Sequence, residues 1–170
     1  MLEESLRQNT YLSMEIKENI KELINTFIDK FPSIDLTDFY EKSKNLQIKK
    51  LSKFLSTDIS KYDILENTIY FNADQMEKDY DMKHILMYEL LNMISKNGFN
   101  DHDNFLALNA GFTELLANSL VGNESTPIYK EEAAYANIIS IMIGIDVLLQ
   151  AYFNNNPSII TESLNRIGVA

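Results

Sequence analysis

Apolar residues recur every three or four positions between residues 13 and 30, while charged residues occupy the positions between them. This spacing predicts an amphipathic helix. Ser13 is expected to cap its start, and Pro32 cannot continue it. A second helix is expected to begin at Thr37 and to run to about Leu55. The apolar stripe of the first helix consists of Ile16, Ile20, Leu23, Ile24, Phe27 and Ile28.

The pattern changes between residues 62 and 72, where two short runs rich in Tyr, Ile and Phe flank Glu66 and Asn67. Such runs indicate a small hairpin or an edge strand, whose better strand spans Thr68 to Phe71. Helical patterns then return, with expected stops at Asn97-Gly98 and Gly122 and a serine cap at Ser158. The further helices are expected at residues 79–96, 108–120, 130–153 and 158–166, with a polar loop at 99–104.

These elements predict an α+β fold that is predominantly α-helical, with about six helices and a small strand or hairpin element. The 170 residues suit one domain with a sizeable core, and no linker or repeat interrupts them. Within a single domain, 1–170, we expect N-terminal helices at 1–60, a middle region at 61–122 and C-terminal helices at 123–170.

Charge excludes some partners. The net charge is −10, and neither half is basic, because residues 1–80 sum to −4 and the remainder to −6. Binding to nucleic acid or to an anionic membrane is therefore not expected. Residues 133–145 carry no charge, but Asn137 and Asp146 limit the apolar run, which favours a buried core helix over a membrane span.

Location and source are expectations from composition. The charged N-terminus lacks the apolar run of a secretion signal, and the absence of cysteine is compatible with a reducing cytosol. We therefore expect a cytoplasmic protein. The high content of Ile, Asn and Lys suggests an AT-rich, bacterial or phage genome.

The helix at residues 79–96 is apolar nearly all round and is expected to be buried. It contains the frame Tyr88-Glu89-Leu90-Leu91-Asn92. Tyr88 and Asn92 are four residues apart and share a helix face, with Glu89 beside them. This is the frame of H-E-x-x-H, in which two histidines bind one zinc ion and the glutamate activates the metal-bound water. Here both histidines are replaced.

A second segment, LNAGFTELL at residues 108–116, resembles the L-N-E-G-x-x-E segment of the gluzincin metallopeptidases. In that family the glutamate after the asparagine is the third zinc ligand, and Ala110 holds that position here. The interval from Asn92 to Ala110 is 18 residues, close to that of gluzincins of the aminopeptidase kind. Glu114 matches an acid that supports the ligands. The run NTIYFN resembles the edge strand that lines the zincin cleft, so the resemblance covers residues 67–118.

The resemblance implies a zincin-like core from which the zinc ligands have been lost. A phenol, an amide and a methyl group replace the three donors, and none of these is a good zinc ligand. Glu89 remains as a vestigial base without a metal-bound water to activate. We therefore expect no catalytic residues, no metal and no cofactor. The protein would be a pseudo-metallopeptidase that binds a protein or peptide in the former cleft, for which the candidate residues are Tyr70, Tyr88, Glu89, Asn92, Ala110 and Glu114.

Two other interpretations stay open. One is a metal-dependent hydrolase with a non-standard site formed by His84, Glu89 and Glu114. The other is an acidic helical interaction or inhibitor protein without zincin ancestry. His102, between Asp101 and Asp103, is interpreted as part of a solvated loop. The sequence does not determine the partner or the oligomeric state, or whether His84 or His102 binds any metal.

Overall fold

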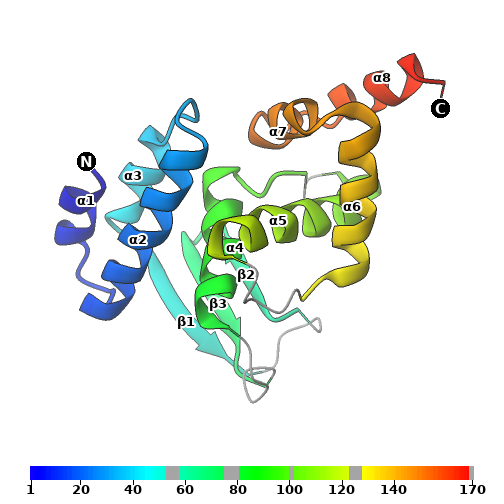
Figure 1. Cartoon of the computed structure of the whole chain (residues 1–170). Helices are drawn as coiled ribbons and strands as arrows, with labels where there is room; N and C mark the ends of the chain where they lie inside the picture. Colours follow the sequence, from blue (N-terminus) through cyan, green and yellow to red (C-terminus); the bar gives the residue numbers. More distant parts are fainter. Residues whose placement is uncertain (53–57, 75–80, 100–101, 123–127, 169–170) are drawn as a thin grey trace. The chain divides into compact units, whose positions relative to one another are not determined.

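The computed structural model divides the chain into two compact units, Met1–Ile94 and Ser95–Ala170 (Figure 1). The boundary falls directly after the helix that carries the YELLN frame, so the two halves of the motif belong to different units. That the whole chain is one domain stays a prediction. The residues that the structure describes are 1–52, 58–74, 81–99, 102–122 and 128–168.

The described residues contain eight α-helices, one 3₁₀ helix and one three-stranded sheet, which confirms a mostly helical α+β fold. The expected count of about six helices is wrong. The first unit contains α1 (Leu2–Gln8), α2 (Met14–Lys30), α3 (Thr37–Ser43), β1 (Gln47–Leu51), β2 (Ser60–Asp63), β3 (Thr68–Asn72) and α4 (Met82–Ile94). The second contains η1 (Asp103–Phe105), α5 (Leu106–Val121), α6 (Lys130–Ile143), α7 (Ile145–Phe153) and α8 (Ser158–Arg166).

The amphipathic helix α2 is confirmed with its cap, since the Ser13 hydroxyl oxygen accepts a hydrogen bond from the backbone N–H of Ile16 at 3.3 Å. The helix expected from Thr37 to about Leu55 is wrong. It ends at Ser43, and Gln47–Leu51 forms β1, which pairs in parallel with β3. Pairing with a strand distant in sequence overrides the local helical preference. Residues 53–55 lie outside the described residues.

Buried Asn9 fixes the segment that follows α3. Its side-chain amide donates to the backbone carbonyl oxygens of Ser43 at 2.8 Å and Leu46 at 2.9 Å. Its side-chain oxygen accepts from the backbone N–H groups of Tyr11 at 2.8 Å and Leu12 at 3.0 Å. One side chain thus satisfies four backbone groups and joins the end of α1 to the start of β1.

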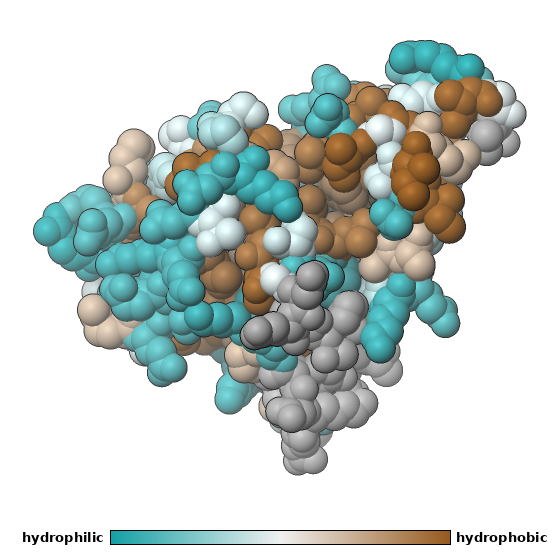
Figure 2. Space-filling model, viewed as in Figure 1, coloured by the Kyte–Doolittle hydropathy of each residue, from teal (hydrophilic) through white to brown (hydrophobic). Residues whose placement is uncertain are grey.

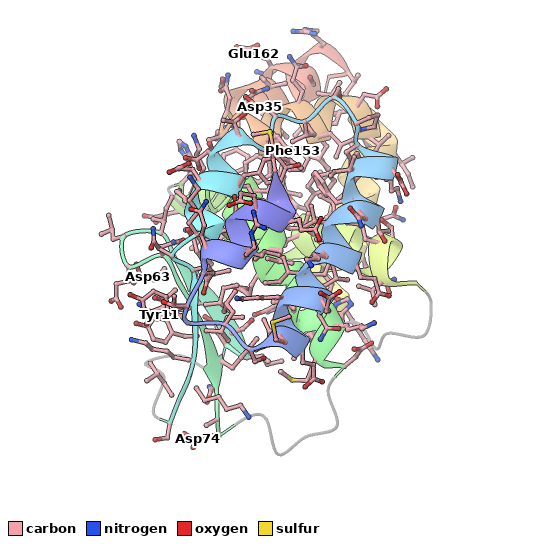
Figure 3. All side chains as sticks on the ribbon, turned by 90° about the vertical axis from the view of Figure 1, so that its left-hand side faces the viewer. Tyr11, Asp35, Asp63, Asp74, Phe153 and Glu162 are labelled. Atoms are coloured by element: carbon pink, nitrogen blue, oxygen red, sulfur yellow. The ribbon has the colours of Figure 1, made fainter. Side chains whose placement is uncertain are left out.

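The hairpin is confirmed as β2 and β3, which pair in antiparallel. Asp63, labelled in Figure 3, lies where β2 ends, and its carboxylate accepts from the backbone N–H groups of Leu65 and Glu66, both at 3.0 Å. Such a bond to residues two positions on is typical of a turn that begins at aspartate. The edge position expected for the second strand is wrong. The sheet order is β1-β3-β2, so β3 is central and all five of its residues are buried.

One face of the sheet packs against helices of the same unit. Ile48 of β1 and Phe71 of β3 line a small pocket together with Ile16 of α2 and Leu86 of α4. Ser60 of β2 pairs with Phe71 and shares this face. The side chains that alternate with these point to the other face of the sheet.

In the second unit the single helix expected at residues 130–153 is wrong. Gly144, with φ at 94°, separates α6 from α7. A glycine adopts this backbone conformation without the steric cost that a side chain would add. Within the described ranges no single helix is long and apolar enough to cross a membrane. Taken together, α6 and α7 pass that test of length and composition, but they are bent by 113°.

Of the other helix boundaries expected from the sequence, the stops at Gly122 and Asn97-Gly98 agree with the structure and the serine cap does not. Gly122 ends α5 with φ at 101°, and Asn97 and Gly98 both have positive φ after α4, so these stops are confirmed. The last helix is confirmed at Ser158–Arg166, but the expected serine cap is wrong. Pro157 is the N-cap residue, and the Ser158 hydroxyl bonds the Asn156 side chain instead.

Helix α6 is only partly buried, contrary to the expected core helix. Ala133, Ala136 and Ile139 form its buried side. Ile138 and Ile141, three residues apart, are 56% and 75% exposed. Figure 2 shows apolar side chains at the surface over this helix. The uncharged residues 133–145 therefore include both buried side chains on one side of α6 and exposed apolar side chains on the other.

Candidate binding site

Helix α4 begins after Asp81, whose carboxylate accepts from the backbone N–H groups of Lys83 at 2.9 Å and His84 at 3.4 Å. This bond satisfies donors that the first turn of a helix leaves open. The ten residues from His84 to Met93 are all buried, as the apolar composition of the helix predicts. The YELLN frame therefore lies in the interior.

Glu89 and Asn92 are in direct contact. The Asn92 side-chain amide donates to Oε1 of Glu89 at 3.1 Å, and both side chains are buried. Ser60 of β2 also bonds the Glu89 carboxyl group. The residue that the zincin resemblance would place at the second histidine thus supplies a hydrogen bond to the residue that it would place at the base. Oε2 of Glu89 accepts no hydrogen bond from the residues that the structure describes.

Burial raises the pKa of Glu89 from 4.5 to about 8. The charged form loses hydration inside the protein, and this effect exceeds the opposing effect of the bonds from Asn92 and Ser60. The negative charge of Asp58 raises the pKa further. Glu89 is therefore a neutral carboxylic acid at pH 7, with 0% of its surface exposed. A protonated, buried acid cannot accept a proton from water.

The other candidates on α4 are also buried. Tyr88 is 8% and His84 1% exposed. Tyr88 lies one turn before Asn92 on the same side of the helix. His84 and Glu89 are five residues apart, which places them about 140° apart around the helix axis. They therefore do not point in one direction, as two ligands on one helix would.

Tyr70 lies on the other face of the sheet from Ser60, because it pairs with Lys61, and neighbouring residues of a strand alternate between faces. Its hydroxyl donates to the carboxylate of Glu66, and the ammonium of Lys61 lies 5.7 Å from its ring centre. The hydrogen bond to Glu66 raises the pKa of Tyr70. The structure thus does not bring Tyr70 together with Glu89, which bonds Ser60.

In the second unit, the asparagine of the LNAGFTELL segment has a structural role. Oδ1 of buried Asn109 accepts the backbone N–H of Phe99 at 2.7 Å. The Thr113 hydroxyl donates to the Asn109 carbonyl oxygen at 2.7 Å and lies 2.8 Å from the Tyr152 hydroxyl. Asn109 therefore joins the loop before α5 to the helix itself.

The glycine of the same segment permits a close crossing of α5 and α6. A Cβ atom on Gly111 would lie 1.9 Å from the backbone oxygen of Glu132 and 2.3 Å from its carbonyl carbon. No side chain fits at this distance, so only glycine lets the two backbones touch here. The crossing places the first turn of α6 beside the middle of α5.

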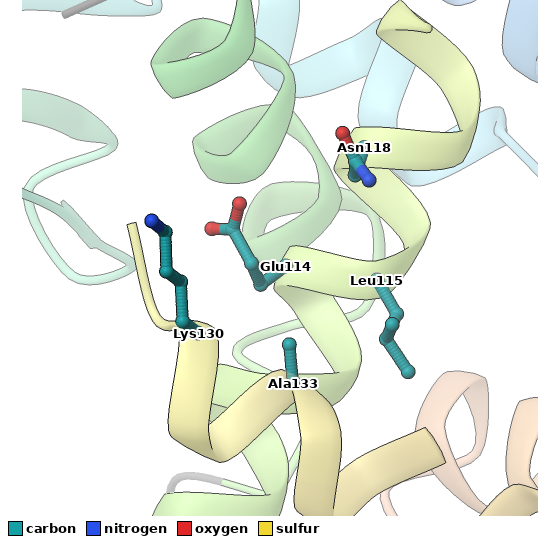
Figure 4. A pocket seen from close by; sticks show the side chains of 5 residues that line it. All are labelled: Glu114, Leu115, Asn118, Lys130 and Ala133. Carbon is teal, nitrogen blue, oxygen red and sulfur yellow. The ribbon is translucent and has the colours of Figure 1, made fainter. Parts of the chain in front are cut away.

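A pocket of about 140 Å³ opens beside this crossing (Figure 4). Glu114 is 1% exposed, and its carboxylate accepts the backbone N–H of Ile128 at 3.3 Å. Ala110, which the resemblance would place at the third ligand position, is half-buried one turn before Glu114 on the same side of α5. The described residues that line it are Glu114, Leu115, Asn118, Lys130 and Ala133.

Asn118 and Lys130 were not among the residues that the sequence singled out. Asn118 lies one turn after Glu114, a spacing that could have indicated it. Lys130 comes from α6, and only the crossing at Gly111 brings it to the pocket. Ser60, beside Glu89, likewise follows from pairing in the sheet and not from any local pattern.

Within the described parts of the chain, no group of three or more His, Asp or Glu side chains is arranged to hold a metal ion. His102 is exposed, and its neighbour Asp101 lies outside those parts. Comparisons with protein-family models, with curated proteins and with solved structures give no match for this chain.

Proposed function

We propose that this protein is a zincin-like pseudo-metallopeptidase that acts by binding a protein or peptide and not by hydrolysis. The observation that carries the proposal is the contact between Asn92 and Glu89. By the zincin resemblance, Asn92 would stand at the position of a zinc ligand and Glu89 at the position of the base. Here the amide satisfies a buried acid, whose raised pKa of about 8 keeps it neutral at pH 7.

A general base must be ionised at the working pH and must reach the proton that it removes. Glu89 meets neither condition, since it is neutral at pH 7 and 0% exposed. An amide at position 92 gives no strong bond to zinc but is a good donor to a carboxyl group. The replacements are therefore consistent with a packed interior where a catalytic site stood.

Binding can use another part of the molecule. The pocket beside Glu114 has a volume of about 140 Å³ and is lined by both charged and apolar groups. Clefts of such mixed character are typical of sites that recognise a ligand. The former third-ligand helix would then serve recognition.

The test restores the three donors with Tyr88→His, Asn92→His and Ala110→Glu in one chain. We expect the folded triple variant to bind one zinc ion with micromolar affinity or better, measured by calorimetry and by metal analysis after dialysis. The matched control is the double variant Tyr88→His/Asn92→His, which lacks the third ligand and should bind at least tenfold more weakly. A folded triple variant without zinc affinity would contradict the zincin alignment.

A second measurement addresses the loss of activity. The unmodified chain, incubated with zinc and a mixture of unstructured peptides, should give no cleavage products by mass spectrometry. Cleavage that disappears in Glu89→Gln would overturn the proposal and favour the hydrolase with a non-standard site.

A further inference from the structure

The pocket beside Glu114 carries a more specific inference about the partner, which rests on the proposed function only in that the partner is a protein or peptide. Figure 4 shows Glu114 and Asn118 of α5 and Lys130 and Ala133 of α6 around one hollow. The described residues that line it all belong to the second unit.

Two of the side chains that line this pocket, Glu114 and Asn118, carry acceptor oxygens. Glu114 is almost fully buried and brings a carboxylate, one oxygen of which accepts the Ile128 N–H. Oδ1 of Asn118 is shielded from solvent and accepts no hydrogen bond from the residues that the structure describes. A buried acceptor without a donor costs free energy, so this atom favours a ligand that donates.

The spacing of the two acceptors selects the shape of the donor. Glu114 and Asn118 are four residues apart on α5, which separates them by about 6 Å along the helix. A guanidinium group carries five N–H donors in a planar fork and can reach two acceptors at once, whereas an ammonium is a compact point charge. Guanidinium is also more weakly hydrated and enters an enclosed site at lower cost.

The remaining lining fits the rest of an arginine side chain. Leu115 and Ala133 give the pocket apolar walls, against which a chain of methylene groups can pack. Lys130 is exposed at its rim and forms no ion pair with any residue in the described parts of the chain. Its positive charge opposes a cation only weakly, because solvent screens an exposed charge.

We infer that this pocket receives an arginine side chain of the partner, with its guanidinium group donating to Glu114 and Asn118. The acidic character of the chain, with a net charge of −10, favours the approach of a basic segment. An anionic ligand would face a carboxylate and an amide oxygen, so Lys130 alone would have to hold it.

The test uses the ¹⁵N-labelled full chain and two peptides, Ac-Gly-Arg-Gly-NH₂ and its citrulline counterpart, which has nearly the same shape without the charge. NMR titration should show amide shifts at Glu114, Leu115 and Asn118 with the arginine peptide, at millimolar affinity, and at least tenfold weaker binding of citrulline. Equal binding of the two peptides, or shifts confined to other surfaces, would overturn the inference.

Variants separate the pocket from general attraction to an acidic surface. Asn118→Leu and Glu114→Gln should each weaken binding at least fivefold, whereas Asn118→Asp should strengthen it. The matched control Glu131→Gln, which removes an exposed charge from the first turn of α6, should leave binding within twofold. An equal loss with Glu131→Gln would show surface attraction only and contradict the pocket.

The variant Lys130→Met should change binding in opposite directions for an arginine ligand and for an anionic ligand. It should strengthen the binding of the arginine peptide slightly, since a positive charge leaves the rim. A loss of binding would instead mean that Lys130 holds an anionic group, and this would overturn the inference. None of these variants alters Tyr88, Asn92 or Ala110, so failure here leaves the zinc restoration test unaffected.

Discussion

The side-chain amide of Asn92 donates a hydrogen bond to Oε1 of Glu89 over 3.1 Å, inside a helix that is buried on all sides. This contact joins two residues to which the zincin resemblance would assign different tasks, a zinc ligand and a base. Removal of a metal from such a site would leave a buried acid without a cation, which is costly. A neutral acid paired with an amide avoids that cost. The pair therefore contributes to the dependence of stability on pH, and its contribution can be tested by mutation.

We predict that Glu89 makes the protein less stable as pH rises. Its pKa is about 8 in the folded state and 4.5 in the unfolded chain, so between these pH values the unfolded chain releases a proton that the folded chain keeps. Below about pH 4.5 both states are protonated and the effect is absent. Between about 4.5 and 8 the free energy of unfolding should fall by up to ~1.4 kcal/mol per pH unit from this group. Urea unfolding across this range measures the slope.

The variant Glu89→Gln should abolish this contribution, because glutamine has a similar shape and does not ionise. Its stability should equal that of the parent near pH 4.5 and exceed it by an increasing margin towards pH 8. Glu15→Gln, at the exposed first turn of α2, is the matched control and should keep the slope of the parent. Parallel slopes for Glu89→Gln and the parent would show that Glu89 is ionised at neutral pH.

Asn92→Leu should destabilise the protein by about 1–2 kcal/mol, the cost of leaving a buried carboxyl oxygen without its donor. The loss should grow with pH, since the bond from Asn92 lowers the pKa of Glu89 and its removal raises that pKa further. In a Glu89→Gln background the growth with pH should vanish. A double-mutant cycle at pH 5 and pH 8 tests both statements. A loss that is the same at both pH values would contradict the pairing.

Asn109→Leu should cost about 1–3 kcal/mol, because the buried N–H of Phe99 loses its acceptor. Asn109→Asp keeps an oxygen at the same place and should retain more of the stability than leucine. The measurement is urea unfolding, with hydrogen exchange at the Phe99 amide as a local probe. Unchanged protection of that amide in Asn109→Leu would show that the bond does not hold the loop.

The sequence predicted those elements whose stability is local. Helix α2 has its apolar stripe, its serine cap and a proline after its end, and all three are visible in the sequence. The hairpin follows from two β-prone runs that flank Glu66 and Asn67, as the sequence predicted. Contact between Glu89 and Asn92 also follows from local spacing, since residues three apart on a helix are neighbours.

Features that depend on distant partners were not predicted. The segment Gln47–Leu51 has no strong strand pattern and becomes a strand because β3 offers it an unpaired edge. Asn9 reaches Ser43 and Leu46 across more than thirty residues, and no local pattern indicates this. Tyr70 was expected beside the former site, but alternation along β3 turns it to the other face from Phe71.

Gly111→Ala is the sharpest test of the α5–α6 crossing. In an ordinary helix interior, alanine instead of glycine stabilises by about 0.5–1 kcal/mol. Here the added Cβ would lie 1.9 Å from the Glu132 backbone oxygen, and a backbone atom cannot rotate away as a side chain can. The two helices must separate, so we expect a net loss of about 1–3 kcal/mol.

A matched glycine separates steric contact from backbone strain. Gly122 has φ at 101°, and no atom in the described parts of the chain lies within 4 Å of the position that a Cβ atom would take there, so Gly122→Ala reports the backbone strain, about 1–3 kcal/mol. Only Gly111→Ala should also displace α6, which would move Ala133 away from Glu114 and weaken the binding of the arginine peptide. Stabilisation by Gly111→Ala would mean that the two backbones do not touch, and the pocket beside them would then lose its structural basis.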